Sequence, residues 1–322
     1  MQLGKLALAA SASLSLLTGA VIQGAQQPKS LPLALFSQAK AADFLGNAKC
    51  VECHDDNVAQ FPKSAHAIYM QGSGLPIDKQ GCEACHGPGA LHIKEEGGQV
   101  ISYKSLSPKE VSDACLRCHG DLMKKSHWQS EAHARADVSC VSCHQIHPKG
   151  EQANPHSGDR NLVKKQVFAA VKDSSPLLKA DEPTLCNQCH KAEVSDFRKS
   201  SHHPVPEGRL LCSDCHSLHA SNGDKMKVAT TKEKCVSCHG EIAGPFTFEH
   251  DPVAGLTGNG CNECHKPHGS NNPTLLKSYS RGVCGQCHTD KQTNHYPGRS
   301  CWNAGCHAAL HGSNTDRLLR TR

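Results

Sequence analysis

Cysteine and histidine dominate the chemistry that this chain of 322 residues could perform, with 20 cysteines and 23 histidines. The cysteines form ten pairs, and a histidine directly follows the second cysteine of every pair. This pattern attaches haem c, because the two thiols bind the macrocycle covalently and the histidine coordinates its iron. Nine pairs have two residues between the cysteines, whereas Cys301 and Cys306 have four, a spacing that can bulge while both sulfurs still reach the haem.

The sequence therefore predicts ten covalent haem c groups, one for each motif. The attaching cysteines are Cys50, Cys53, Cys82, Cys85, Cys115, Cys118, Cys140, Cys143, Cys186, Cys189, Cys212, Cys215, Cys235, Cys238, Cys261, Cys264, Cys284, Cys287, Cys301 and Cys306. The histidines expected to coordinate iron on the proximal side are His54, His86, His119, His144, His190, His216, His239, His265, His288 and His307.

Two other uses of paired cysteines fit the sequence less well. Structural zinc requires four ligands from two half-sites and has no need of a histidine after every second cysteine. A disulfide scaffold would suit an even number of cysteines in an oxidising compartment, but it also leaves the ten motif histidines unexplained.

Thirteen further histidines are available as distal iron ligands for ten haems. Three are in excess: His156, one of His127 and His133, and one of His202 and His203. The candidates chosen as distal ligands are His66, His92, His133, His147, His202, His219, His250, His268, His295 and His311.

The spacing of these histidines restricts which haem each can serve. His147, His219 and His268 lie three residues after a motif histidine, and three extended residues span at most about 11 Å. Two histidines on opposite sides of one iron need a larger separation, of roughly 12 Å between their Cα atoms. Each of the three must therefore reach a neighbouring haem, most simply that of the preceding motif, while His66 and His250 would serve a member of their own motif pair.

The supply of ligands indicates electron transfer rather than catalysis. Only three methionines follow the N-terminal 41 residues, so histidine is the general distal ligand and the haem potentials should be low. An iron with two histidine ligands has no open position for a substrate, and none of the ten motifs lacks its histidine. A multihaem nitrite or hydroxylamine enzyme would need such an open iron.

Few apolar residues are available to form the rest of the structure. Phe, Trp and Tyr make up only 4 % of the chain, so the haem macrocycles must supply most of the buried apolar surface. The sequence between the motifs is rich in Gly, Pro, Ser, Asn and Lys. This composition predicts a multihaem cytochrome c fold, elongated, with short α-helices and loops around a haem stack and little or no β-structure.

Four segments are expected along the chain. Residues 1–41 are typical of a signal peptide, with Lys5, an apolar run and a small-residue cleavage site, although an uncleaved anchor is the alternative. Residues 42–147 carry haems 1–4, residues 148–185 form a motif-free connector that contains a helix-like stretch at 162–171, and residues 186–322 carry haems 5–10.

The charge of the working protein should differ from the formal value of +5. Residues 1–41 contain Lys5, Lys29 and Lys40 and no acid, so their removal leaves +2, and two propionates on each haem would then make the protein acidic. Nucleic-acid binding therefore has no electrostatic basis.

The haem number, the chain length and the segment from Cys301 to Asn314 resemble the periplasmic decahaem cytochromes of the MtrA, DmsE and PioA family. The likeness extends from about Cys50 to Asn314. It implies a periplasmic protein held at the outer membrane inside a β-barrel porin, with a periplasmic cytochrome and an extracellular cytochrome or reductase as redox partners. A loop-rich chain suits a polar barrel interior rather than lipid. A free periplasmic shuttle or electron store with the same haems is the alternative.

Overall fold

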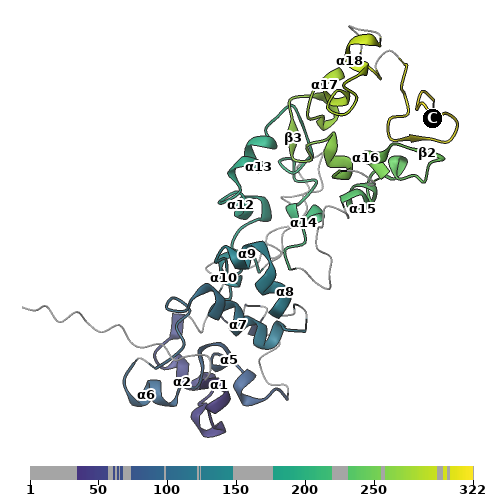
Figure 1. Ribbon diagram of the computed structural model, residues 1–322. Helices are drawn as coiled ribbons and strands as arrows, with labels where there is room; N and C mark the ends of the chain where they lie inside the picture. Colours follow the sequence, from purple (N-terminus) through teal and green to yellow (C-terminus); the bar gives the residue numbers. More distant parts are fainter. Residues whose placement is uncertain are drawn as a thin grey trace, which may run out of the picture.

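The described part of the chain forms an elongated body with the N-terminal helices at one end and the C-terminal segments toward the other (Figure 1). The computed structural model describes residues 35–56, 61, 64, 66–67, 74–97, 99–121, 123, 125–147, 177–219, 231–254, 258–295, 300–302 and 305–321. His156 and the helix-like stretch at 162–171 lie outside these residues.

Short helices make up the N-terminal half. The longest, α7, begins with Pro108 after a Ser107 N-cap whose hydroxyl accepts from Glu110 N, and these features fix its start. The elements are α1 (Leu35–Gln38), η1 (Ala41–Asp43), α2 (Asn47–Val51), η3 (Ile77–Lys79), α5 (Glu83–His86), α6 (Ala90–Lys94), α7 (Pro108–His119), α8 (Lys125–Ser130), α9 (Ala132–Arg135) and α10 (Cys140–Cys143).

The C-terminal half has the same character, with helices of at most six residues among its described elements. These are α12 (Glu182–Cys186), α13 (Lys191–Asp196), α14 (Cys212–Cys215), α15 (Thr231–Val236), η7 (Gly240–Ile242), α16 (Asp251–Ala254), η8 (Gly260–Glu263), η9 (Pro273–Leu275), α17 (Arg281–Cys284) and α18 (Lys291–Asn294). Thr274, inside η9, has a left-handed backbone.

Two antiparallel strand pairs complete the described elements. Strand β1 (Ser201–His202) pairs with β3 (Gly269–Ser270), and β2 (Phe248–Glu249) pairs with β4 (Gly312–Ser313). Isolated bridges join His144 to Leu178 and His265 to Leu276. Short helices and loops with very little sheet confirm the predicted fold class.

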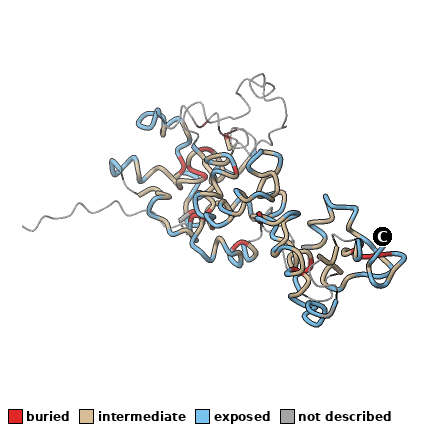
Figure 2. The backbone as a smooth tube through the Cα atoms, turned by 90° about the horizontal axis from the view of Figure 1, so that it is seen from above, coloured by how far each residue is buried: buried red, intermediate tan, exposed pale blue. Residues whose placement is uncertain are grey.

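Few apolar side chains of the described residues are buried, and most of those lie in the N-terminal half. They are Phe36, Phe44, Phe61, Ala67, Ala84, Ile101, Val111, Leu116, Trp128, Val283 and Ala309. Figure 2 shows the buried residues as short, separated stretches within a backbone that is mostly intermediate or exposed. The polypeptide thus has no continuous apolar core of its own in the described region, as expected if haems supply it.

The N-terminal boundary predicted after residue 41 falls within packed structure. Phe36 in α1 is buried, and the Arg117 guanidinium lies 3.4 Å from the centroid of its ring, a cation–π contact. The boundary stays a prediction, which the N-terminal residue of the purified protein would test.

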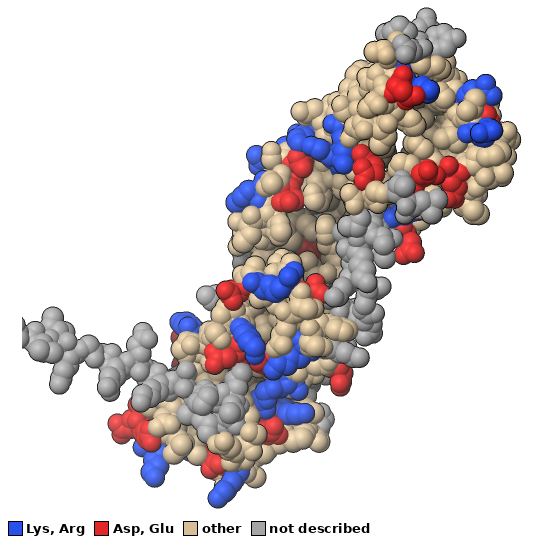
Figure 3. Space-filling model, viewed as in Figure 1, with Lys and Arg blue, Asp and Glu red and all other residues tan. Residues whose placement is uncertain are grey.

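Basic and acidic side chains are interspersed on the described surface. Lys and Arg side chains alternate with Asp and Glu along the face seen in Figure 3, with no large area of one sign. In the described part of the chain, the helices are all too short or too polar to span a membrane.

Candidate haem-binding site

Each haem motif closes into a single helical turn. The backbone N–H of the histidine donates to the carbonyl of the first cysteine at 2.8–3.0 Å in motifs such as Cys50–His54, Cys212–His216 and Cys284–His288. Because residues one helical turn apart share a face, this turn presents the histidine beside the first cysteine. The two thiols and the imidazole are thus offered together to one macrocycle.

The tenth motif keeps this closure despite its four-residue spacing. His307 N donates to Cys301 O at 3.1 Å, and Gly305, whose N–H donates to Trp302 O at 3.0 Å, has a left-handed φ of 72°. Glycine adopts this conformation without a Cβ clash, so the bulge costs little. The wider motif therefore still brings its histidine next to its first cysteine.

In three of the even-numbered motifs, a returning segment fixes the orientation of the motif histidine. The Nδ1 atoms of His86, His265 and His307 lie 2.9, 2.7 and 2.7 Å from the carbonyl oxygens of Ile101, Thr274 and Leu318 respectively. A neutral imidazole that donates from Nδ1 has its lone pair on Nε2, which is the form that coordinates a metal.

Ten pairs of histidine rings face each other in the described part of the chain, and each pair contains one motif histidine and one histidine from outside the motifs. The ring centroids are 5.7–6.3 Å apart. The pairs are His54–His92, His86–His147, His119–His66, His144–His219, His190–His133, His216–His268, His239–His203, His265–His311, His288–His250 and His307–His295.

This separation suits an iron held between two imidazoles. Two metal–nitrogen bonds of about 2 Å each, added to the two ring radii, bring the centroids to about 6 Å. Aromatic rings in direct contact can have similar separations, so distance alone does not identify the site. The distinguishing feature is the pairing of every motif histidine with a histidine from elsewhere.

The surroundings of three of these rings illustrate how burial favours the uncharged form. Burial, followed by the charge of the facing histidine, lowers the pKa of His66, His147 and His216. His66 also has a buried Nδ1 atom with no hydrogen-bond partner. Neutral, buried imidazoles opposite one another fit haem iron, which needs an unprotonated nitrogen on each side.

The facing pairs follow a regular rule along the chain. Apart from the two ends, a histidine that follows an odd-numbered motif faces the motif two places later, and one that follows an even-numbered motif faces the motif two places earlier. Thus His203, after the fifth motif, faces His239 of the seventh, and His268, after the eighth, faces His216 of the sixth. At the ends, His92 faces His54 of the first motif, and His295 faces His307 of the tenth.

This rule differs from the expected pairing with the preceding motif. His147, His219 and His268 avoid the motif beside them, as their spacing requires, but they face His86, His144 and His216, each two motifs earlier. Likewise, His66 and His250 face histidines of the next odd-numbered motif rather than of their own pair. The facing histidines therefore link successive motif pairs to one another.

At the choice between His202 and His203, the structure turns His203, and not the candidate His202, toward a motif histidine. Both His202 nitrogens are engaged, with Nδ1 2.6 Å from Lys199 O and Nε2 3.0 Å from a Glu207 carboxylate oxygen. The Glu207 carboxylate and then the Lys199 carbonyl raise the pKa of His202, which favours the charged form that cannot ligate. His203 donates from Nδ1 to Pro267 O at 2.6 Å and faces His239.

The other nine distal candidates all face a motif histidine. At the choice between His127 and His133, the structure places His133 opposite His190 at 6.1 Å, whereas His127 lies on α8 and its carbonyl accepts from Ser130 Oγ. The geometry therefore favours His133.

The cysteines join neighbouring motifs into one series. The thiols of the first cysteines meet within each pair: Cys50 with Cys82, Cys115 with Cys140, Cys186 with Cys212, Cys235 with Cys261 and Cys284 with Cys301. The second cysteines lie close enough between pairs to interact electrostatically: Cys85 and Cys118, Cys143 and Cys189, Cys215 and Cys238, and Cys264 and Cys287. These interactions relate all ten motifs in sequence order.

Polar residues just before two of the odd-numbered motifs support the pairs, a role that the motif pattern did not indicate. Asn47 Oδ1 accepts from Cys82 N at 2.8 Å, and the buried Glu182 carboxylate accepts from Ser213 N and Ser213 Oγ at 2.5 and 2.9 Å. Asn47 lies three residues before Cys50 and Glu182 four before Cys186, so no fixed position in the sequence indicates this role.

All twenty cysteines are described, and all are present as free thiols. Among the described residues, no three His, Cys, Asp or Glu side chains form a group that could hold a bare metal ion.

Comparisons with known proteins agree with this site. Residues 202–244 and 250–293 match the doubled CXXCH motif family, and residues 82–165 match the cytochrome c-type protein NrfB-like family. The multiheme cytochrome MtrA of Shewanella baltica is 33 % identical over 65 % of this chain and 57 % of its own length. The C-type polyheme cytochrome OmcC of Geobacter sulfurreducens is 24 % identical over 56 % of this chain and 27 % of its own length.

A nine-heme cytochrome c of Desulfovibrio desulfuricans is 23 % identical over 50 % of this chain and 59 % of its own length. The chain thus spans less than two thirds of each of these three relatives. Repeated haem motifs, facing histidines and the similarity to MtrA agree with one another. The chain is a multihaem c-type cytochrome that is similar to MtrA.

Proposed function

We propose that this protein carries ten haem c groups, each with two histidine ligands, and conducts electrons along them. Each haem would be attached by its motif cysteines and held between the motif histidine and the histidine that faces it. This proposal takes His203 as the distal ligand in place of His202. The protein would act as an electron carrier rather than an enzyme, because the ten pairs supply two ligands for every iron.

The observation that carries the proposal is the nearness of cysteines from successive motifs. Each cysteine sulfur becomes part of a haem edge, so neighbouring sulfurs imply neighbouring haem edges. First cysteines meet in five pairs, from Cys50–Cys82 to Cys284–Cys301, and second cysteines of successive pairs lie close enough to interact electrostatically, along an elongated body (Figure 1). An electron could therefore tunnel from one end of the molecule to the other through closely spaced haems.

We further propose that the protein crosses the outer membrane inside a β-barrel porin and connects a periplasmic cytochrome with an extracellular cytochrome or reductase. The likeness to MtrA and the elongated shape support this role. A body whose surface is polar and whose loops are exposed requires a polar sheath rather than lipid.

Intact mass and spectroscopy of the purified, air-oxidised protein test the haem assignment. Ten haem additions, low-spin ferric EPR signals only, and no response to cyanide are expected. A His66→Ala variant is the positive control, because it should open one iron and bind cyanide. Fewer than ten haems, or a high-spin centre in the unaltered protein, would contradict the proposal and favour an enzyme.

Membrane vesicles test the conduit. Outer-membrane vesicles that contain the protein should oxidise an enclosed reduced dye when an impermeant ferric complex is added outside, and a large barrel protein should co-purify. The alternative is a free periplasmic shuttle with the same haems. Recovery of the protein solely in the soluble periplasmic fraction, with no transfer across vesicles, would establish that alternative.

A further inference from the structure

The loop that follows the tenth motif contacts three neighbouring haem sites. This C-terminal loop, residues 309–321, contains His311, whose ring faces His265 at 6.3 Å. The carbonyl of Leu310 accepts from His250 Nδ1 at 3.1 Å, and the carbonyl of Leu318 accepts from His307 Nδ1 at 2.7 Å. Leu310 and His311 directly follow the tenth motif. Leu318 lies farther along the chain, so other residues must hold its carbonyl in place.

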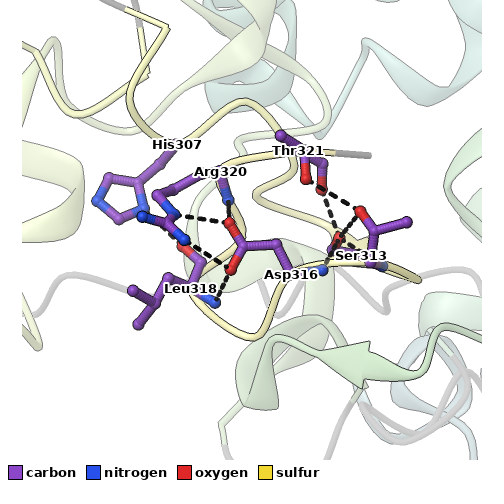
Figure 4. A network of polar contacts seen from close by, with 7 residues as sticks. His307, Ser313, Asp316, Leu318, Arg320 and Thr321 are labelled. Atoms are coloured by element: carbon purple, nitrogen blue, oxygen red, sulfur yellow. Dashed lines mark hydrogen bonds and ion pairs between the residues drawn. The ribbon is translucent and has the colours of Figure 1, made fainter.

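Asp316 provides this support by holding the turn that presents the Leu318 carbonyl. Its carboxylate accepts from Leu318 N at 2.9 Å through one oxygen and from Arg320 N at 3.2 Å through the other (Figure 4). Arg320 Nε also donates to this carboxylate at 2.7 Å. The Asp316 side chain is only 13 % exposed, so these bonds are partly shielded from water.

Ser313 anchors the turn to the rest of the protein. Its hydroxyl accepts from Asp316 N at 3.0 Å and from Thr315 N at 3.2 Å, and it donates to the carbonyl of Thr321. Ser313 is completely buried within β4, which pairs with β2 directly before His250. The turn is therefore fixed from both sides, and the Leu318 carbonyl has one position relative to His307.

We propose that Asp316 is a positioning residue that sets the orientation and donor strength of His307 at the tenth haem, an inference that rests on the proposed haem ligation. A hydrogen bond from the far nitrogen of a ligand histidine fixes the ring and raises its basicity. A more basic ligand stabilises ferric over ferrous iron, so the bond lowers the reduction potential of that haem. Loss of Asp316 should free the Leu318 carbonyl, weaken this bond and raise the potential of one terminal haem.

The test compares Asp316→Ala with the matched control Asp113→Ala in the full-length protein. Asp113 has a similarly shielded side chain, 16 % exposed, and accepts from Lys109 and Lys125 at 2.8 and 2.9 Å, so its removal also breaks ion pairs. Haem content is measured by intact mass, midpoint potentials by protein-film voltammetry, and ligand geometry by EPR. A His295→Met variant identifies the tenth haem, because methionine ligation raises its potential.

Asp316→Ala should retain every haem of the parent protein, shift to higher potential the component that His295→Met identifies, and leave the other components unchanged. Asp113→Ala should shift none. Arg320→Ala should shift that component less than Asp316→Ala does, because the carboxylate still accepts from Leu318 N.

Unchanged potentials and EPR signals in Asp316→Ala would overturn the inference. So would loss of a haem, since Asp316 would then be needed for attachment rather than for ligand orientation. Failure of the ligation proposal itself would be visible in the unaltered protein as a missing haem or a high-spin iron.

Discussion

Replacement of His203 by alanine should open the iron of the seventh haem, whereas the same change at His202 should not. The two residues are adjacent in sequence, so composition and spacing do not separate them. In the structure, the His203 ring lies 6.2 Å from that of His239, while both His202 nitrogens are engaged by Lys199 and Glu207. Only the first change removes a group that faces a motif histidine.

The size of the expected effect follows from the ten motifs. One of ten irons would lose one axial ligand, so a tenth of the haem should become five-coordinate or bind water. His203→Ala should therefore bind one carbon monoxide per molecule when reduced, and the unaltered protein none. His203→Met should keep the iron six-coordinate and raise one potential, because methionine stabilises the ferrous state.

Carbon monoxide titration with intact-mass analysis measures this effect directly. Mass confirms that the thioether-linked haem is retained in each variant, so ligand binding reports the open iron rather than lost haem. His202→Ala is the matched control and should bind no carbon monoxide. Binding by the His202 variant with none by the His203 variant would refute the pairing seen in the structure. It would also refute the rule of two motifs, by which a histidine faces the motif two places away.

Three further outcomes are expected. Deletion of residues 203–249 should give a folded protein with eight haems, all with two histidine ligands. The reason is that His250 and His268 then take over the positions of the lost His203 and His219. Intact mass and EPR would check this. EPR should contain strongly anisotropic low-spin signals from the third and fifth haems, whose facing rings are 87° and 88° apart, since perpendicular imidazoles bring two iron d orbitals close in energy. Glu83→Ala should lower the free energy of unfolding of the N-terminal half by roughly 2–4 kcal/mol, because three backbone N–H groups lose the acceptor that the buried Glu83 provides. Glu83→Gln should lower this free energy less, and thermal unfolding would measure both.

The sequence predicts which residues form the motifs and the distal candidates better than it predicts which histidine faces which motif. The attachment motifs are local, because a turn of five residues carries both thiols and a histidine, and nine of the ten distal candidates face a motif. The choice between His202 and His203 is not local. Consecutive residues of an extended segment point to opposite sides, and the pairing of β1 with β3 decides which of the two faces His239.

The rule of two motifs could not be predicted from the sequence either, because the length of a connecting segment sets only how far a histidine can reach. Three residues exclude the adjacent haem but do not choose between the haems one and two motifs away. That choice depends on how the motifs meet, first cysteine to first cysteine within a pair and second to second between pairs. Only the folded chain contains this information.

The strand pairs reveal why the molecule can be long without a large apolar core. The segment before His203 pairs with the segment after His268, and the segment before His250 pairs with the segment after His311. The same unit thus recurs with a shift of two motifs, and each unit places histidines opposite the motif histidines of its neighbours on both sides. As in other repeat proteins, stability comes from contacts between successive units rather than from one central core. The end motifs depart from the rule because their facing histidines, His92 and His295, come from the adjacent motif of the same pair. At both ends the facing histidines therefore stay within the terminal pair, whereas in the interior they link each pair to the next.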